Sequence, residues 1–497
     1  MRRKLLFGAD FADYPIMQEM LLGFAQQHDV LIGGRSGRAD TAGRDHEFAY
    51  FDWQPYQRAD EVPHATVANG VVDAAMETEY AEAWRQFARA LDRVFLDPLP
   101  AREAERYFWA LVAGLATWIS ERASTLVVWF AHTPHFPWHI VFFHVCQRLK
   151  VPVYIFKRTQ LPDGMFFDTD LVCGRAPLPS ATAGLSADAW LDTLDEVSGR
   201  LKRSHEINRR AESAAYRPMG LGLKWKLIRR YYRARHGYRN HHYFRQPWWR
   251  LYRYALRRDR ERRADLSYLT RHARRDAPSA PYIYFALHYQ PERTTVPEAG
   301  FYHDQLRAIT ALARAMPNDW TLVVKEHPRQ LGDRRPDLRC LHYGREPLYQ
   351  GITELGNTVL MDAFASAEGL IAGAELTASC NGSSVFEGLK HGIPGLTFVP
   401  TWHSACASAP AIGDMKALPG MMNELAAKTP EQVRADLAQF IRDESRHWFV
   451  GANDDRAAQL SARDRNVLVA SMRTEVQALL GRTDHRRTSF DLGPERC

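Results

Sequence analysis

Short apolar runs alternate with stretches of helical periodicity along most of this chain, and this alternation constrains the fold more than any other feature. In the first 160 residues, the runs 4–8, 29–33, 125–130 and 151–156 have the length and composition of strands. Between them, Tyr80, Trp84, Phe87 and Leu91 recur on one face of a helix. Strands that alternate with amphipathic helices predict a parallel sheet with helices on both faces.

A second series of strands begins near residue 280. It comprises the runs 282–287, 321–324, 358–361, 376–379 and 396–399, with a helix over 304–316. Two such series in tandem predict an α/β fold with two Rossmann-like domains that face a cleft. In folds of this kind, ligands bind at the carboxyl ends of the strands.

The length of 497 residues exceeds that of one ordinary domain, so we expect two or three. We predict a first Rossmann-like domain over 1–175 and a second over 279–415. A basic, aromatic-rich helical insertion over 176–278 separates them. Helices over 416–482 and a disordered tail over 483–497 complete the expected organisation.

The stretch 201–263 differs in composition from the rest of the chain. It holds 20 Lys/Arg against four acids, a net charge of +16, whereas the whole chain carries +7. It also holds 11 aromatic residues, and Leu221, Trp225, Ile228 and Tyr232 share one helical face. Basic helices rich in Trp and Tyr suit an anionic membrane surface. An insertion that packs its aromatics onto the two domains is an equal alternative, and nucleic acid is a third for which no binding motif is present.

Several classes of protein are excluded. The six cysteines are scattered without a CxxC pair, which indicates free thiols in a reducing cytosol. The first residues have too few apolar positions for a secretory signal. The uncharged stretch 123–147 contains two prolines, so a strand, a loop and a short helix explain it better than a membrane span. We therefore expect a cytoplasmic protein.

The segment "WTLVVKEHPRQ" ends a buried strand on a cluster of ionisable residues. At this position a ligand could meet Lys325, which supplies positive charge, and His327, which can donate a hydrogen bond to a phosphate oxygen. Pro328 favours extended geometry at His327. An ordinary loop histidine is the alternative.

The segment "TASCNGSSVFEGLKHGIPGLTF" predicts a strand, a small-residue loop, a helix and another strand. Ser384 and Glu387 have capping-box spacing, and Gly392 is placed to end the helix. Asn381, Gly382 and Ser383 would leave backbone N–H groups at the helix start, where anions bind. The serine could instead serve only as a cap. The motifs GxGxxG and GxxxxGK[ST] are absent, which argues against a dinucleotide fold and a P-loop NTPase.

Two further loops carry candidate residues. After the first strand of the second domain, Gln290 and Glu292 would lie at the cleft edge, where Glu292 could act as a base, a nucleophile or a ribose ligand, or pair with Arg293. In the first domain we expect three histidines on the opposite cleft wall, followed by Asp163, while Asp10 and Asp13 lie in a similar loop. Those histidines are His132, His135 and His139. Their spacing across two prolines does not predict a metal site, and a general base is the better interpretation.

These motifs resemble those of a known family. "KEHP" followed by "NGSSVFEGLKHGIPGLTF" resembles bacterial glycosyltransferases of the GT-B fold, and most closely the capsule polysaccharide biosynthesis family, which includes Kdo transferases that use CMP-Kdo. The resemblance covers about residues 280–403, the first domain in outline only, and the basic stretch not at all. It implies that His327, Ser383 and Ser384 bind the donor phosphate and that Glu387 contacts the nucleotide or orients the helix. Kdo transferases of this type tend to carry an aspartate after the first strand of the nucleotide domain, where this chain has Glu292.

The resemblance implies a cytoplasmic transferase, peripheral to the inner membrane, that moves a sugar such as Kdo from a CMP-activated donor to a glycan or glycolipid acceptor. The donor would bind at Lys325, His327, Gln290 and residues 381–384 with Glu387. His135 or Asp163 would activate the acceptor in an inverting reaction, and Glu292 would act in a retaining one. Metal, cofactor and nucleic acid are not expected, and the anionic membrane surface would meet residues 201–263. The alternatives are a CDP-glycerol glycerophosphotransferase and a non-catalytic polysaccharide assembly or export protein.

Overall fold

The structure is a computed structural model. It describes residues 3–8, 15–34, 49–57, 61–63, 74–92, 94, 98–180, 185–194, 212, 222, 225, 248–332, 345–453 and 461–485. The described strands fall into two separate sheets, each with its own hydrophobic core.

The first sheet has a parallel centre with strand order β5-β4-β1-β2-β3. These strands are β1 (Lys4–Phe7), β2 (Asp29–Gly34), β3 (Ala49–Asp52), β4 (Leu126–Phe130) and β5 (Val153–Arg158). Beyond β5 the sheet continues with β6 (Gly164–Asp168), which is antiparallel to β5. The strand β6 also pairs with β7 (Pro177–Leu178) and with β13 (Phe449–Val450). Lys4 pairs with Leu126 on one side and Asp29 on the other, so β1 lies at the middle of the parallel part.

Helices cover both faces of this sheet because alternate residues of its strands are apolar on both sides. Leu6 and Val128 pack into one core with the helices α3 and α4, whereas Leu5 and Val127 pack into the other core with α1. The helices are α1 (Pro15–Leu22), α2 (Ala74–Glu79), α3 (Ala81–Leu91), α4 (Ala101–Ser120) and α5 (Pro137–Arg148), with the short turn η2 (Gln54–Gln57). The stretch 123–147 forms β4, a loop and most of α5, as predicted.

The second sheet is wholly parallel, with the order β10-β9-β8-β11-β12. Its strands are β8 (Tyr282–Ala286), β9 (Thr321–Lys325), β10 (Thr358–Met361), β11 (Leu376–Ser379) and β12 (Gly395–Thr397). Its helical segments are η5 (Gly300–His303), α10 (Gln305–Ala315), α11 (Pro328–Gly332), α12 (Glu346–Thr353), α13 (Ala367–Ala372), α14 (Ser384–His391), α15 (Leu418–Ala426) and α16 (Pro430–Glu444).

Both sheets therefore follow one topology. We call each sheet with its helices a unit. When the parallel strands of a unit are numbered in chain order, they run 3-2-1-4-5 across the sheet, so the order reverses between strands 1 and 4. The predicted α/β fold with two Rossmann-like units is confirmed. The reversal points, between β1 and β4 and between β8 and β11, are where such folds bind ligands.

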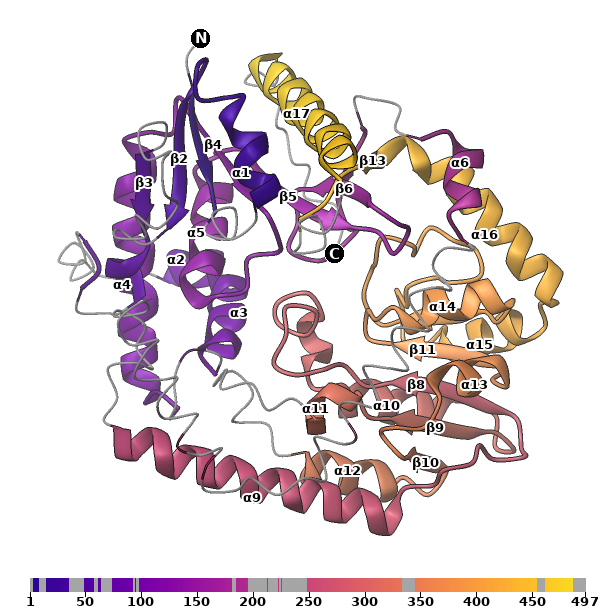
Figure 1. Ribbon diagram of the computed structural model, residues 1–497. Coiled ribbons are helices and arrows are strands. Elements are labelled where there is room, and N and C mark those ends of the chain that lie inside the picture. Colours follow the sequence, from indigo (N-terminus) through magenta and orange to yellow (C-terminus); the bar gives the residue numbers. More distant parts are fainter. Residues whose placement is uncertain are drawn as a thin grey trace.

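The C-terminal part of the chain returns to the first sheet. After α16 and the turn η7 (Ser445–His447), β13 pairs with β6, and α17 (Ala462–His485) packs against α1 (Figure 1). The helix α6 (Ala187–Asp192) packs on α16, and Trp190 and Trp448 meet there in a shared apolar cluster. The domain boundaries proposed above stay predictions.

A long helix, α9 (Trp248–His272), runs along the lower edge of the molecule in Figure 1 and packs on α12 and β10. The predicted helical face of Leu221, Ile228 and Tyr232 lies outside the described residues. Within the described part of the chain, none of the helices has the length and apolarity needed to cross a bilayer.

Candidate functional site

The reversal point of the second sheet brings together the loops that follow β8, β9 and β11. Because β8 lies between β9 and β11, residues just past the ends of these strands become neighbours. The loop after β9 carries His327, the loop after β11 leads into α14, and the loop after β8 carries His288. These three segments form the candidate site.

The helix α14 begins at Ser384, and Ser383 is its N-cap residue. The Ser383 hydroxyl donates to Glu387 Oε1 at 3.1 Å, so the capping pair predicted between Ser384 and Glu387 is wrong by one residue. Burial raises the pKa of Glu387, and the Ser383 bond partly offsets this. Gly392 ends the helix as predicted, with a φ of 79° that favours glycine.

Three buried oxygen atoms near the start of α14 have no hydrogen-bond partner among the described residues: Ser384 Oγ, Asn381 Oδ1 and Thr294 Oγ1. Ser384 is only 6 % exposed. Asn381 Nδ2 donates to the Thr294 carbonyl at 2.8 Å, which fixes the loop after β8 against the start of α14. A buried polar atom without a partner destabilises a fold by about 1–3 kcal/mol, so a ligand that supplies partners here gains affinity.

His288 lies at the centre of the site. Its Nε2 is 3.1 Å from Ser379 Oγ and accepts from the Asn381 backbone N–H at 3.4 Å, while Gly382 N–H donates to Ser379 Oγ at 2.8 Å. Burial, and secondarily Arg345, lowers the pKa of His288 to about 4, so the ring is neutral near pH 7. A Cβ on Gly382 would stand 2.5 Å from Ser379 Oγ and 3.0 Å from His288 Cε1, so this contact requires glycine.

His327 follows β9, where the sequence predicted a ligand. Its Nδ1 accepts from the Arg329 backbone N–H at 3.2 Å, so the neutral ring carries its proton on Nε2. Burial lowers the pKa of His327 to about 3, assisted first by Lys325 and then by Arg329, His288 and Arg345. The ring is therefore a neutral N–H donor surrounded by cationic groups.

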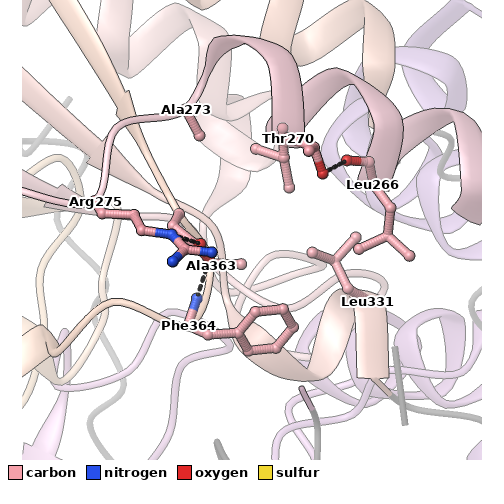
Figure 2. Close-up of a pocket in the computed structure, with 9 residues that line it drawn as sticks. Leu266, Thr270, Ala273, Arg275, Leu331, Ala363 and Phe364 are labelled. Carbon is pink, nitrogen blue, oxygen red and sulfur yellow. Dashed lines mark hydrogen bonds and ion pairs between the residues drawn. The ribbon is translucent and has the colours of Figure 1, made fainter. Parts of the chain in front are cut away.

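Lys325, also predicted as a ligand, is buried with its Nζ donating to the Ala363 carbonyl at 2.7 Å. Burial lowers its pKa to about 8, against the opposing effect of Glu326 and Asp362. Beside it, a pocket of about 70 Å³ lies between α9, α11 and the end of β10. Figure 2 shows Leu266, Leu331 and Phe364 around this opening, with the Arg275 guanidinium at its other side. The pocket is large enough to hold water.

A buried ion pair between Arg345 and Glu326 contacts the loops that carry His288 and His327. Arg345 Nε lies 3.0 Å from Glu326 Oε2, and Arg345 Nη2 donates to the His288 carbonyl at 2.7 Å. Glu326 Oε1 accepts from the His327 backbone N–H at 2.6 Å. The pair thus fixes the two loops relative to one another.

Gln290 belongs to the same support. It accepts from Arg345 Nη1 at 2.5 Å, its Nε2 donates to the His303 carbonyl at 2.7 Å, and its backbone exchanges bonds with Gln330. The side chain of Gln290, which we predicted to bind the donor, therefore bonds to other protein groups and positions this loop. Glu292 is exposed, and its carbonyl accepts from Thr295 and Val296 to close a tight turn.

The loop after β8 continues into the first unit. Glu298 is buried and accepts from the Thr133 hydroxyl, and its Oε1 lies 3.4 Å from Lys157 Nζ. Arg89 Nη1 donates to the Gly300 carbonyl at 2.8 Å. Burial lowers the pKa of Lys157, but Glu298 opposes this and the net pKa is raised. One segment, 288–300, therefore joins the reversal points of both sheets.

In the first unit the three histidines have separate environments. His132 Nδ1 is 3.1 Å from Asn453 Nδ2, and burial with the nearby Arg293 holds its pKa well below the usual range. His139 lies in the core, where its ring centroid is 4.5 Å from that of Trp53, and burial lowers its pKa to about 3. The expectation that all three line a cleft wall is wrong for His139, because α5 turns it into the core.

His135 bonds through Nδ1 to the Thr133 carbonyl at 2.9 Å. A carbonyl only accepts, so Nδ1 carries the proton and Nε2 is the basic nitrogen. Asp163 adopts a φ of 49° in the turn between β5 and β6, and its carbonyl accepts from Gly451 at 2.8 Å. Asp10 and Asp13 lie outside the described residues.

Sequence reasoning placed Thr294 in the loop at the cleft edge but missed His288 and the Arg345–Glu326 pair. His288 could have been found, because it stands two residues past β8 just as His327 stands two residues past β9. Arg345 lies in a different segment, and only the folded chain brings it to the site. Across the residues that the structure describes, there is no group of His, Cys, Asp and Glu side chains suited to a metal ion.

Neither a family model nor a curated protein matches this chain. Solved structures give only distant likenesses. Spinosyn rhamnosyltransferase SpnG in complex with thymidine diphosphate is 14% identical, with 90% of this chain and 97% of that chain covered, at a TM-score of 0.27. KpsC from Thermosulfurimonas dismutans, a β-Kdo 2,7 transferase, is 10% identical over 71% and 94% of the two chains, at 0.28.

An α,α-trehalose-phosphate synthase (UDP-forming) from Burkholderia vietnamiensis is 10% identical over 97% and 100%, at a TM-score of 0.32. Likenesses with TM-scores this low bear on neither the activity nor the ligands of this chain. Its function has to be argued from its own residues.

Proposed function

We propose that this protein is a glycosyltransferase that binds the phosphate of a nucleotide-sugar donor at the start of α14. The observation that carries the proposal is the convergence of three features at one reversal point. These are the N–H groups at the start of α14, the Ser384 hydroxyl, which has no partner among the described residues, and the neutral ring of His327 with its proton on Nε2. Together they offer hydrogen-bond donors to a group rich in acceptor oxygens.

The electrostatics favour an anion. The start of a helix carries a partial positive charge and unpaired N–H groups. Lys325, Arg329 and Arg345 act on the same region, since each depresses the pKa of His327. When the bond to the sugar breaks, negative charge develops on the departing nucleotide phosphate. Donors already fixed around that position stabilise the charge without further reorganisation.

The first unit would hold the acceptor. Thr133 and Lys157 meet the loop after β8 through Glu298, so the reversal points of the two sheets face each other across this segment. His135 is our preferred base, because its Nδ1 bond leaves Nε2 as the basic nitrogen. Asp163 and Glu292 remain the other candidates for activating the hydroxyl or for a retaining reaction.

We propose a CMP-activated donor, used to build a capsule or other surface polysaccharide. The support is the resemblance of "KEHP" and "NGSSVFEGLKHGIPGLTF" to the capsule biosynthesis family. The same phosphate site suits CDP-glycerol, which is the second candidate donor. Kdo is the first sugar to test, and the basic segment supports attachment to the anionic face of the inner membrane.

The test is a donor-hydrolysis and binding assay with CMP-Kdo, CMP-sialic acid, CDP-glycerol and UDP-sugars. We expect turnover with a cytidine donor, and His327→Ala should abolish donor binding while the melting temperature stays close to that of the wild type. The matched control is His391→Ala at the far end of α14. Turnover with CDP-glycerol alone would support the glycerophosphotransferase. Absence of binding and turnover with every donor would leave the non-catalytic assembly protein.

A further inference from the structure

The helix α9 has two chemically opposite faces. Its inner face buries Asp259, Arg262 and Asp265 with Leu266 and Leu269. Arg262 Nη2 donates to Asp259 Oδ1 at 2.9 Å. Asp265 Oδ1 accepts from the backbone N–H groups of Arg345 and Glu346, at 2.9 and 2.8 Å. The two Asp265 bonds join α9 to another segment and fix its rotation about its axis, so its outer face is set by the fold.

The outer face is basic and carries two apolar side chains. Trp249 is 44 % exposed and Leu256 is 37 % exposed. The exposed arginines of this face are Arg253, Arg257, Arg260 and Arg263. Counted from Trp249, these residues fall at i+4, i+7, i+8, i+11 and i+14, the spacing of a single helical face. They extend over about 20 Å of helix, at 1.5 Å per residue.

Two arginines of this face pair with carboxylates and still stay exposed. Arg263 pairs with Asp259 at 3.1 Å but keeps 64 % of its side chain exposed. Arg257 lies 3.7 Å from Glu261 and keeps 48 % exposed. Asp259 and Asp265 are themselves buried, so the charge that the described residues expose on this arc is that of its arginines.

We propose that the outer face of α9 is a docking surface for an anionic lipid membrane. Charge complementarity requires an anionic partner, and the exposed Trp249 and Leu256 on the same arc fit a surface with an apolar layer beneath its headgroups. Tryptophan is enriched at that depth of a bilayer. A nucleic acid or an acidic glycan would use the arginines but offers no apolar layer for Leu256.

Docking through α9 has a consequence for the donor site. Asp265, on the inner face of the same helix, holds the N–H of Arg345, and Arg345 supports the His288 loop. The membrane face and the candidate donor site are thus attached to one helix. Given the proposed function, the membrane would hold that site at a set distance from a lipid-linked acceptor.

The test is co-flotation of the full chain with vesicles of phosphatidylglycerol and phosphatidylcholine, or of phosphatidylcholine alone. We expect binding to the anionic vesicles only. The variant Arg253→Gln/Arg257→Gln/Arg260→Gln should bind on the order of 100-fold more weakly, from about tenfold or less per arginine. The control Arg102→Gln/Arg106→Gln/Arg314→Gln removes the same charge from exposed positions on α4 and α10 and should bind as the wild type does.

Trp249→Ser should weaken binding and Trp249→Phe should restore most of it, which a purely electrostatic partner would not require. Equal flotation of both triple variants would overturn the proposal, as would binding to DNA or dextran sulfate with none to vesicles. Donor binding is measured on the same samples. Flotation without donor turnover would contradict the proposed function and leave the docking surface standing.

Discussion

The reversal points of the two sheets share one topology but differ in chemistry. In the second unit, α14 starts with small residues, and Ser384 Oγ and Asn381 Oδ1 are unpartnered in the described structure. In the first unit, α5 starts at Pro137, which has no N–H, and continues with Trp138 and the core residue His139. The same strand order therefore carries one helix start with small polar residues, where we propose that an anion binds, and one apolar helix start. The residues at the helix start distinguish the two sites, because their topology is the same.

The largest expected effect concerns the contact between the two units. Glu298→Gln removes the counter-charge nearest to the buried Lys157, and we expect a loss of about 3–5 kcal/mol in the free energy of unfolding. The control Glu82→Gln removes an exposed partner of Arg85 and should change stability by about 0–1 kcal/mol. Urea unfolding measures both. Equal small losses would show that the buried pair does not hold the units together.

The second effect is a dependence of the free energy of unfolding on pH, to which one buried histidine in each unit contributes. His288, with a pKa of about 4, and His139, with a pKa of about 3, stay neutral in the fold, whereas the unfolded chain takes up a proton below about 6.5. The unfolded state then binds more protons, so stability falls as the pH drops from 6.5 towards 4.

For His288 the loss is about 3 kcal/mol by pH 4, as an order of magnitude. His288→Gln and His139→Phe should each flatten the acid side of the stability profile. Because His288 belongs to the candidate site and His139 to the core of the first unit, we expect only His288→Gln to weaken donor binding as well. A loss of donor binding in His139→Phe would contradict the assignment of that histidine to the core.

A third effect follows from the close contact at Gly382. Gly382→Ala places a Cβ against Ser379 Oγ and His288, and we expect about 1–3 kcal/mol of destabilisation and a donor affinity lowered at least tenfold. The control Gly413→Ala meets no atom within 4 Å and should leave both quantities unchanged. Calorimetry with CMP and thermal unfolding give the two readouts. Unchanged CMP affinity in Gly382→Ala would separate this loop from the donor.

The smallest effect distinguishes a ligand serine from a capping serine. Ser384→Ala removes a buried hydroxyl without a described partner, so stability should stay the same or rise by up to about 1 kcal/mol while donor affinity falls about tenfold. Ser366→Ala removes a hydroxyl that caps α13 by accepting from Gly369 N–H, so stability should fall by about 1 kcal/mol with donor affinity unchanged. Destabilisation by Ser384→Ala would make that serine structural.

Much of the fold follows from apolar periodicity, and the failures have physical causes. The strands at 321–324 and 376–379 match β9 and β11 within a residue, because each is a continuous buried run. The strand β13 has two residues and exists only because β6, nearly 300 residues earlier, pairs with it. Local sequence carries no trace of such a pairing.

The candidate site was partly predictable for the same reason. His327 and the start of α14 stand at strand ends that sequence locates, whereas Arg345 reaches the site through a long-range ion pair with Glu326. The helix begins one residue earlier than predicted, so Ser383 is its N-cap residue, and the Ser383 side chain bonds to Glu387 and does not cap a backbone N–H group. His139 was wrongly predicted to line the cleft. The helix α5 begins at Pro137, two residues before His139, and directs its side chain into the core.

The most direct test of the central claim is a crystal structure of the protein with CMP. We expect phosphate oxygens within about 3.2 Å of the Ser384 hydroxyl and of His327 Nε2, at the start of α14. A phosphate bound at the start of α5, or a nucleotide placed away from both His288 and His327, would contradict it.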